Sequence, residues 1–350
     1  MRKRLTGALL AILLLCALAG CDQLTGERTV ASPTEGSRFQ VHFIDVGQAD
    51  SALVICDGHY MLIDGGNAED SDLIYAYLER HGADHLDYMV ATHAHEDHIG
   101  GLSGALNYAA VDVAYCPVTE YSTKVFQNMV KYLGEQGKSL TVPEPGEQFS
   151  LGSAQVEILG PVKEYSDTNN TSIVLRIDYG ETSFLFTGDM ETAAETDLID
   201  SGADLRATVL KAGHHGSDTS SSYQFLREVM PQYTVISVGE GNSYGHPSEE
   251  VLSRFRDAGT EVYRTDMQGH VIAESDGKTV TFRTEKEADT ATNPTGNSAL
   301  QTYIGNTNSK KFHLPDCTSV KSIQDANRVD FEIRLDAVLA GYEPCGRCKP

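Results

Sequence analysis

The stretch THAHEDHIGG, residues 92–101, constrains this chain more than any other feature. It directly follows the apolar run DYMVA, and it contains His93, His95, Asp97 and His98. A loop, unlike a helix, can direct such closely spaced side chains toward two points. Imidazole nitrogen and carboxylate oxygen are ligands that suit Zn²⁺ and similar divalent ions. We therefore predict a metal-binding loop at the end of a strand, with a solvated histidine-rich turn as the alternative.

Short β-rich runs, separated by Gly, Asp or Asn turns, surround this loop. The expected strands cover 39–47, 51–56, 60–66, 87–93, 156–161, 171–180, 182–189, 207–216 and 233–239. The expected helices cover 70–82, 191–202, 221–230 and 247–259, and residues 261–285 are typical of closing hairpins. Gly100 and Gly101 are expected to let the chain turn tightly into a helix. Sheet-forming halves with helices between them predict an α/β layered sandwich.

Other candidate site residues lie in further motifs of the chain. They are Asp45 in FIDVGQADS, Asp189 in FLFTGD, His214 and His215 in AGHHGS, and His246 in YGHPS. Asp45 is either a plain turn residue or an outer carboxylate that orients the histidine loop, as metal sites usually require. Lys211, just before the histidine pair, would meet either a phosphate or solvent. The other histidines are interpreted as structural or surface residues, namely His42, His59, His81, His85 and His270.

These motifs occur in the order of the metallo-β-lactamase superfamily. Residues 38–284 resemble, in particular, the hydrolase domain of ComEC-type DNA-uptake (competence) proteins and its stand-alone relatives. The resemblance implies an αββα sandwich, here bounded as residues 38–285, with metal-dependent hydrolase activity. It also implies that Asp45 supports the metal loop and that Asp189 bridges two metal ions.

The resemblance implies two sets of metal ligands. One set is His93, His95 and one of His214 and His215, with His215 favoured as the ligand and His214 as the side chain that meets the substrate. The other set is Asp97, His98, Asp189 and His246. The third-motif histidine of many superfamily members is missing, because no His occurs between His98 and His214. Asn169, Asn170 and Ser172 occupy that region, as in the ComEC-like group, and Asn170 is expected to support the site from outside.

A pair of divalent ions, Zn²⁺ or Mn²⁺, would supply a hydroxide at neutral pH and offset charge on a carbonyl or phosphoryl oxygen. Asp97 and His214 are the predicted catalytic residues. The same geometry serves several hydrolytic reactions, so the fold does not select the substrate. The resemblance implies a nuclease or phosphodiesterase acting on DNA. Two alternatives stay open: an envelope hydrolase of small phosphodiesters (like choline-phosphate esterases) or lactones, and a non-catalytic lipoprotein that captures DNA.

The N-terminus is typical of an export signal. MRKR precedes the short apolar run LTGALLAILLLCALAG, and Leu18-Ala19-Gly20-Cys21 resembles the bacterial lipobox. We predict a signal peptide over residues 1–21, lipid on Cys21, a flexible tether over 22–37, and anchoring to the outer face of the cytoplasmic membrane. A plain signal peptide with an incidental cysteine is the alternative. The formal net charge of -23 argues against a grip on nucleic acid through bulk charge, although a local basic groove remains compatible with it.

The last part of the chain differs in character. After a polar linker over 286–301, residues 302–350 carry seven Lys and Arg against six Asp and Glu. FHLPDC and EPCGRC place His313, Cys317, Cys345 and Cys348 at spacings that suit a closed tetrahedral zinc site, which would stabilise so small a domain. A disulfide such as Cys345–Cys348 is the alternative.

Cys56 and Cys116, in the large domain, are expected to be buried free thiols, with a disulfide between them as the other possibility.

Residues 302–350 resemble the zinc-binding domain of the Ada DNA-repair methyltransferase. That family uses four Cys, the first of which accepts a methyl group from DNA phosphate, and His313 stands at the matching position. The resemblance therefore implies a zinc ion and the fold rather than methyl acceptance. It favours DNA contact through the basic residues of this domain, with a solvated basic face as the alternative; these residues are Lys310, Lys311, Lys321, Arg328 and Lys349.

Overall fold

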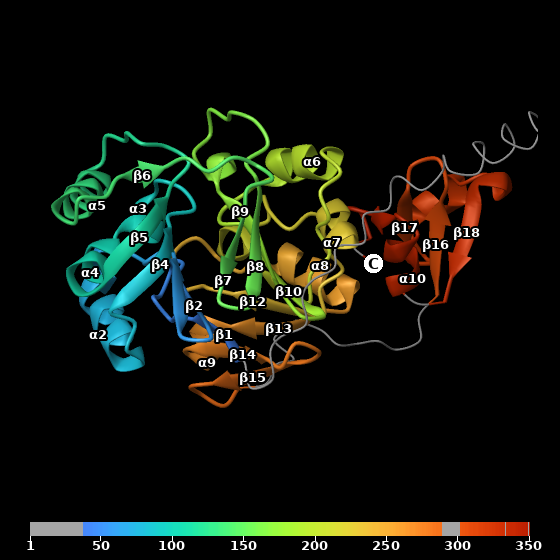
Figure 1. The fold of residues 1–350 in the computed structure, drawn as a ribbon. Coiled ribbons are helices and arrows are strands. Elements are labelled where there is room, and N and C mark those ends of the chain that lie inside the picture. The colour runs from blue at the N-terminus through green and yellow to red at the C-terminus, as the bar shows by residue number, and fades with distance from the viewer. Residues whose placement is uncertain (1–37, 289–301, 333, 349) are drawn as a thin grey trace, which may run out of the picture.

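The computed structural model describes residues 38–288, 302–332, 334–348 and 350 (Figure 1). The predicted signal peptide with Cys21, the tether over 22–37, most of the linker over 286–301 and Lys349 lie outside the described residues. Within the described part of the chain, every helix is too short or too polar to cross a membrane.

Two β-sheets form the body of the protein. The first has the strand order β15-β14-β1-β2-β3-β4-β5-β6. Its strands are β1 (Phe39–Phe43), β2 (Ala52–Cys56), β3 (His59–Ile63), β4 (His85–Val90), β5 (Ala110–Tyr115), β6 (Leu140–Thr141), β14 (Val271–Ser275) and β15 (Val280–Thr284). The second has the order β13-β12-β11-β10-β9-β8-β7. Its strands are β7 (Gln148–Leu151), β8 (Ala154–Gly160), β9 (Val174–Tyr179), β10 (Thr182–Phe186), β11 (Val209–Lys211), β12 (Tyr233–Ile236) and β13 (Glu261–Arg264).

The central core lies between the two sheets, and strand alternation explains it. Successive side chains of a strand point to opposite faces. In β2, Val54 and Cys56 therefore join the central core, while Leu53 belongs to the core on the other face of the sheet. In β10, Phe184 lies in the central core while Leu185 faces the helices of the second half. Apolar residues on both faces of these strands thus require a helical layer on each outer side.

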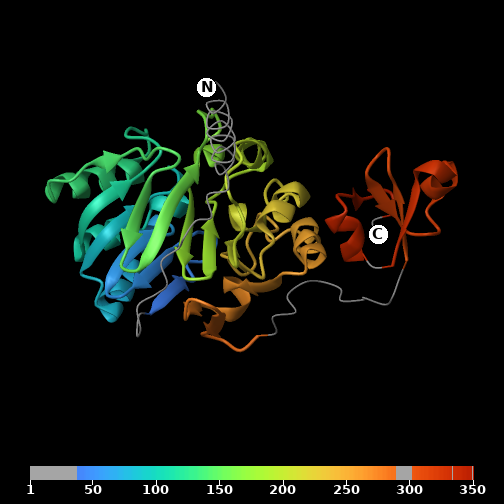
Figure 2. The ribbon, with the colours of Figure 1, turned by 45° about the vertical axis from the view of Figure 1, so that its right-hand side comes forward.

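Helices provide both outer layers, which gives the predicted αββα sandwich (Figures 1 and 2). Those in the first half are α2 (Ser71–His81), α3 (Glu96–Ile99), α4 (Leu102–Tyr108) and α5 (Lys124–Glu135), and those in the second are α6 (Thr192–Asp200), α7 (Tyr223–Val229) and α8 (Glu249–Ala258). α2 ends as predicted at Gly82, whose left-handed φ of 66° suits glycine. The side chain of Ser248 caps α8 by accepting a hydrogen bond from the backbone N–H of Val251.

The segment 261–285 differs from the predicted run of hairpins. β13 pairs with β12 in the second sheet, and the short helix α9 (Thr265–Gln268) then carries the chain across to the first sheet. Only β14 and β15 form a hairpin, and β14 pairs with β1. The segment thus joins the two sheets at one edge of the sandwich.

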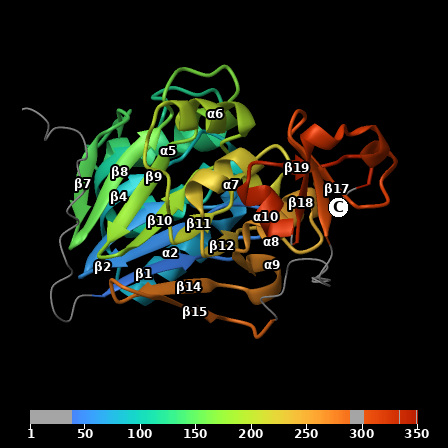
Figure 3. The ribbon, with the colours of Figure 1, turned by 90° about the vertical axis from the view of Figure 1, so that its right-hand side faces the viewer.

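A small four-stranded sheet with the order β18-β16-β17-β19 lies beside this body. It comprises β16 (Tyr303–Asn306), β17 (Lys311–His313), β18 (Arg328–Phe331) and β19 (Glu343–Pro344), with helix α10 (Arg334–Leu339) packed against it. Figures 1 and 3 show α10 next to α7 and α8. Tyr223 of α7 packs against the small core of this C-terminal module, which contains Phe312 and Tyr342.

Candidate metal centre

The candidate ligands lie where neighbouring strands end. β3 and β4 are parallel, as are β10, β11 and β12, so their carboxyl ends lie at common edges. The histidine loop follows β4, Asp189 follows β10, and the His214–His215 pair follows β11. Residues far apart in sequence therefore meet in one place, as in other α/β folds whose sites lie beyond the carboxyl ends of strands.

Four side chains form a compact group whose ligand atoms lie within 4.8 Å of one another: Asp97, His98, Asp189 and His215. Asp189 Oδ1 lies 3.2 Å from His98 Nε2 and 3.8 Å from His215 Nε2. His215 Nε2 is also 3.3 Å from Asp97 Oδ2. His98 Nε2, His215 Nε2 and Asp189 Oδ1 are buried without a hydrogen-bond partner. Buried polar atoms are normally satisfied, so three converging unpaired atoms of this chemistry fit a divalent cation.

The second oxygen of Asp189 faces other imidazoles. Asp189 Oδ2 lies 3.8 Å from Nε2 of His93 and 3.7 Å from Nε2 of His214. His93 Nε2 is in turn 3.0 Å from Nδ1 of His95, which is partly exposed. The carboxylate of Asp189 therefore lies between two groups of imidazoles, the arrangement expected of a residue shared by two ions.

The structure groups these side chains differently from the predicted sets of ligands in three respects. His215 lies with Asp97 and His98, and not with His93. His214 lies on the His93 side of Asp189. His246 lies further from Asp97 and His98 than predicted: its ring is next to that of His214, with centroids 5.7 Å apart, and its Nδ1 is buried without a partner.

The backbone of the histidine pair explains the first two differences. His214 and His215 both adopt left-handed conformations, with φ of 48° and 52°. Such angles are uncommon for residues other than glycine and are found at functional sites, where surrounding structure holds them. In this turn the side chain of His214 faces Oδ2 of Asp189 and that of His215 faces Oδ1. The spacing of the two histidines in the sequence does not reveal this division.

Asp64, and not Asp45, supports the histidine loop. His98 Nδ1 lies 2.8 Å from Asp64 Oδ2, and the backbone N–H of Thr92 donates to Asp64 Oδ1 at 2.8 Å. Asp45 instead accepts from the backbone N–H of Gly47, while its own N–H donates to Nδ1 of His270. The sequence signal was present in YMLIDGG, where Asp64 follows a buried strand. A carboxylate on the outer nitrogen of a ligating imidazole fixes its tautomer and orientation.

Asp50 lies behind His215 less directly than Asp64 lies behind His98, because Nδ1 of His215 forms its hydrogen bond with the backbone carbonyl of Ser237 at 3.1 Å. Its Oδ1 is 3.3 Å from His215 Nδ1, and its Oδ2 accepts a hydrogen bond from Lys211 Nζ at 2.8 Å. Lys211 is buried, so it contacts neither a phosphate nor solvent, which were the two predicted alternatives. Asp50 was not identified from the sequence, although it lies in the same FIDVGQADS motif as Asp45.

The region without the third-motif histidine contributes hydrogen bonds to the site. Ser172 Oγ accepts from the backbone N–H of Asp189 at 3.0 Å and lies 3.4 Å from His93 Nδ1. The side-chain oxygen of Asn170 accepts from the backbone N–H of Glu191. Glu191 Oε1 is 3.3 Å from His214 Nδ1. Asn170 thus reaches Asp189 through Glu191 and His214, whereas Ser172 contacts Asp189 directly.

The two glycines that end the histidine motif are required for close packing. Both have ordinary helical φ values, -58° for Gly100 and -81° for Gly101. A Cβ on Gly100 would lie 2.2 Å from the backbone nitrogen of Ala68, and one on Gly101 would lie 2.0 Å from the carbonyl oxygen of Gly65. The expectation that they permit a tight turn is therefore replaced by a steric reason: they let α3 and α4 contact the loop that follows Asp64.

The electrostatics of the group favour positive charge. Burial alone would lower the pKa of His98, but the carboxylates of Asp189 and Asp64 hold it well above its ordinary value. Burial likewise opposes protonation of His215, yet Asp189 and Asp50 raise its pKa to about 10. Burial would raise the pKa of Asp189, while His98 and His215 hold it well below its ordinary range. The same carboxylates would favour a divalent cation at these nitrogens, and its binding would release the imidazole protons.

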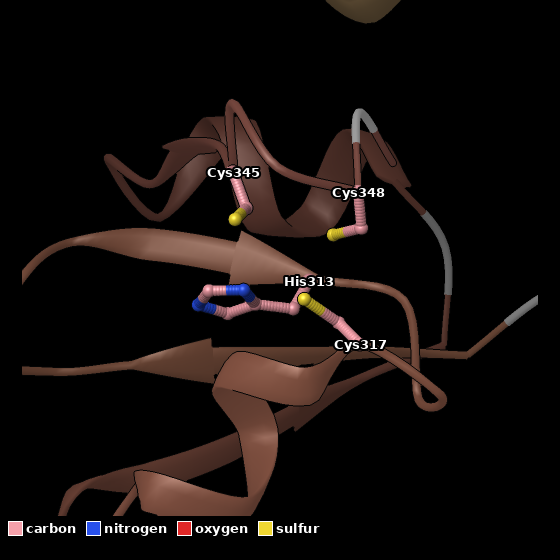
Figure 4. Close-up of side chains that lie close together, drawn as sticks. All are labelled: His313, Cys317, Cys345 and Cys348. Atoms are coloured by element: carbon pink, nitrogen blue, oxygen red, sulfur yellow. The ribbon is translucent and has the colours of Figure 1, made fainter.

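A second group of metal-binding side chains lies in the C-terminal module (Figure 4). Its members are His313, Cys317, Cys345 and Cys348, whose ligand atoms lie within 4.8 Å of one another. Parallel pairing of β17 with β19 brings Cys345 beside His313, and the backbone N–H of Cys345 donates to the carbonyl of Phe312. The three cysteines are free thiols, and His313 Nδ1 is buried without a partner. Three sulfurs and one nitrogen at this spacing fit a tetrahedral metal site.

The remaining predicted features have ordinary environments. Cys56 and Cys116 are free, buried and in separate cores. The basic residues of the C-terminal module are partly occupied: Lys311 pairs with Glu343, Arg328 pairs with Asp330, and Lys310 lies over the ring of Tyr342. The histidines interpreted as structural or surface residues form surface pairs, His59 with Asp87 and His85 with Asp112, or pack around Tyr77, as do His42, His81 and His270.

Comparison with known proteins identifies the family. Residues 44–240 match the sequence profile described as the metallo-beta-lactamase superfamily. The chain belongs to this superfamily. Members of the ComEC group of competence proteins are among its relatives. It is 28% identical to ComE operon protein 3 of Bacillus subtilis over 74% of this chain and 36% of that protein. It is 34% identical to competence protein ComA of Neisseria gonorrhoeae over 64% of this chain and 30% of that protein.

The chain spans about a third of the length of these relatives. Solved structures of the superfamily align with it at low identity. One is the metallo-beta-lactamase fold protein YhfI from Bacillus subtilis, with 15% identity and a TM-score of 0.46 over 68% of this chain and 100% of that one. Another is a diphosphatase of the PhnP family, with 16% identity and a TM-score of 0.41 over 68% of this chain and 97% of that one.

Proposed function

We propose that this superfamily hydrolase is a nuclease or phosphodiesterase that cleaves DNA outside the cytoplasmic membrane. The observation that carries the proposal is the position of Asp189, whose two oxygens face two separate groups of imidazoles. Relationship to competence proteins, which act in DNA uptake, supports DNA as the substrate. The same relationship supports an exported or membrane-associated protein, and lipid on Cys21 would provide the anchor.

We propose that one ion is held by Asp97, His98, Asp189 and His215, and a second by Asp189, His93, His95 and His214. Zn²⁺ and Mn²⁺ both suit these donors. When bound, such a pair lowers the pKa of coordinated water toward neutrality and offsets negative charge on a phosphoryl oxygen. The protein residues do the positioning: Asp64 fixes the ring of His98, and the backbone carbonyl of Ser237, with the carboxylate of Asp50 nearby, positions the ring of His215.

The roles of His214 and His246 are exchanged relative to the sequence-based expectation. His214 Nδ1 is directed at Glu191, which leaves Nε2 to face Asp189 and suits a ligand. His246 lies next to His214 and is only partly buried, so its ring can meet a substrate that approaches the ligands. We propose that His246 forms a hydrogen bond with the scissile phosphate or with the leaving oxygen.

The C-terminal module is proposed to hold one structural Zn²⁺ through His313, Cys317, Cys345 and Cys348. The module has few apolar residues in its core, and a metal would stabilise it. Contact of this module with DNA is part of the proposal. It would have to use residues other than Lys311 and Arg328, which already pair with carboxylates.

The test is metal analysis of the protein without residues 1–21, combined with cleavage assays. We expect two ions in the hydrolase site, one Zn²⁺ in the module, and metal-dependent cutting of single- or double-stranded DNA. Asp97→Ala should lose activity, whereas Asp45→Ala, outside the ligand groups, should retain it. Failure to cut DNA together with hydrolysis of a choline-phosphate ester or a lactone would replace the proposed substrate. Full biological function of His95→Ala, with loss on mutation of the module, would replace catalysis by DNA capture.

A further inference from the structure

The loop between β12 and α8 presents two aromatic rings beside the metal centre. The side chain of Asn242 organises this loop from within. Its Nδ2 donates to the carbonyl oxygens of Gly239 and His246, at 2.9 and 2.6 Å. Its Oδ1 accepts from the backbone N–H groups of Tyr244 and His246, both at 3.1 Å. Hydrogen bonds to both ends of the segment hold Tyr244 and His246 in a defined position.

The side chain of Tyr244 is highly exposed, although hydrogen bonds from Asn242 fix the backbone of its loop. At 72% exposure it is the most exposed of the large apolar side chains that the structure describes. Its ring stacks against that of His246, with centroids 5.8 Å apart and an angle of 25° between the planes. The ring of His246 is 5.7 Å from that of His214, whose Nε2 faces Asp189. A continuous row of rings therefore leads from solvent to the carboxylate shared by the two groups of ligands.

We propose that Tyr244 is a stacking platform for a nucleobase of the substrate, next to the scissile phosphodiester. This inference rests on the proposed nuclease function and specifies how that site would hold its substrate. A planar ring fixed by its backbone and open on one side matches the way proteins bind single strands. Base stacking does not depend on net charge, so it can hold a strand on a protein whose formal charge is -23.

The proposed platform predicts a substrate class. Every base has a π-face, so stacking selects nucleic acid over sugar-phosphate without selecting a sequence. An unpaired base can stack on a protruding ring, whereas a base inside a duplex is already stacked on its neighbours. We therefore expect a preference for single-stranded DNA or strand ends over intact duplex.

The chain contains no Trp, which allows a direct binding test. In the full chain without residues 1–21, Tyr244→Trp would introduce a single tryptophan. A phosphorothioate single-stranded oligonucleotide, which resists hydrolysis, should quench its fluorescence. An abasic strand of equal length should not. Tyr75→Trp on α2, in the helical layer of the other half of the sandwich, is the matched control and should be quenched by neither strand.

A kinetic comparison provides the second readout. The ratio of kcat/KM for a normal strand to that for an abasic strand measures the preference for bases. We expect Tyr244→Ala to reduce this ratio by about 5- to 100-fold, in line with alanine substitutions at stacking residues, and Tyr244→Phe to preserve it. An unchanged ratio in Tyr244→Ala, in a protein that cuts DNA, would overturn the inference while leaving the nuclease function intact. Base-dependent quenching in a protein that cuts no DNA would support the platform and overturn the nuclease function.

Discussion

Lys211 and Asp50 form a buried ion pair beneath the metal centre. Nζ of Lys211 donates to Oδ2 of Asp50 at 2.8 Å, and the side chains are 5% and 7% exposed. Nζ also donates to the carbonyl of Ala212. Asp50 Oδ1 is directed at His215. The pair thus connects the end of β11 to the loop after β1, and it fixes the carboxylate that orients a candidate ligand.

We predict that Lys211→Met destabilises the protein by up to about 3–5 kcal/mol, because the buried carboxylate of Asp50 then keeps only His215 as a cationic neighbour. Asp50→Asn in the same background removes that charge and should recover part of the loss. Urea denaturation of the metal-free protein in chelator measures both effects without a contribution from bound ions. Equal stability of Lys211→Met and the wild type would show that the pair contributes nothing.

Asp64→Asn is predicted to weaken metal binding by about 10- to 100-fold, the usual effect of losing the carboxylate behind a ligating imidazole. Asp45→Asn is the matched control, since Asp45 also follows a buried strand but does not contact a candidate ligand. Competition with a zinc indicator measures the affinity of each variant. Similar affinities for the two would contradict the role given to Asp64.

The contrast between these two residues shows the limit of reading the sequence alone. Both follow apolar β runs, and motif order alone favoured Asp45. The deciding fact is that β3 lies parallel to β4, with Ile63 opposite Val90, so the residue after β3 meets the histidine loop. Strand order is a tertiary property that local pattern does not encode.

Other predictions succeeded because their signal was local. The end of α2 followed from Gly82, and the sandwich followed from sheet-forming halves with helices between them. The C-terminal group followed from cysteine spacing. The division of His214 and His215 between two sides of Asp189 depends on two left-handed residues in succession, which no propensity predicts.

Glu195 is predicted to make stability depend on pH. Its carboxylate is buried and accepts from the backbone N–H groups of Ser221 and Ser222, but burial outweighs these bonds and raises its pKa from 4.5 to about 7. The folded state therefore binds the proton more tightly than the unfolded state. This contribution, on the order of 3 kcal/mol, is fully present below about pH 4.5 and lost as pH rises through about 7.

The test for Glu195 compares variants across this range. The difference in unfolding free energy between the wild type and Glu195→Gln should fall as pH rises from 4.5 to 7.5. Glu228→Gln, an exposed residue of α7, is the control and should show no such trend. A constant difference for Glu195→Gln would mean that folding does not raise the pKa of Glu195.

The C-terminal module is predicted to depend on its metal. His313→Ala should reduce bound zinc by one ion per chain and lower the melting temperature of the module, because the ligands hold β17, β19 and the segment at Cys317 together. His313→Cys should retain the ion, since four thiolates also bind Zn²⁺. Zinc content by mass spectrometry, with thiol titration of the three cysteines, measures the effect. Unchanged zinc in His313→Ala would remove His313 from the ligand set.

Arg334 is predicted to hold the C-terminal module against the hydrolase body. Its guanidinium pairs with Asp257 of α8 and lies over the ring of Phe312, while the hydroxyl of Tyr223 donates to the same carboxylate. Asp257 is only 1% exposed, and Arg334→Ala would leave this buried charge with Arg256, 3.6 Å away, as its cationic partner, at a cost of up to about 3–5 kcal/mol. We expect faster hydrogen exchange in α8 and α10, with β1 and β2 unchanged.

Arg328→Ala removes an exposed ion pair on the same module and should leave the hydrogen exchange of α8 unaffected. Equal exchange in the two variants would show that the module is held by its apolar contacts with Tyr223 and not by the ion pair.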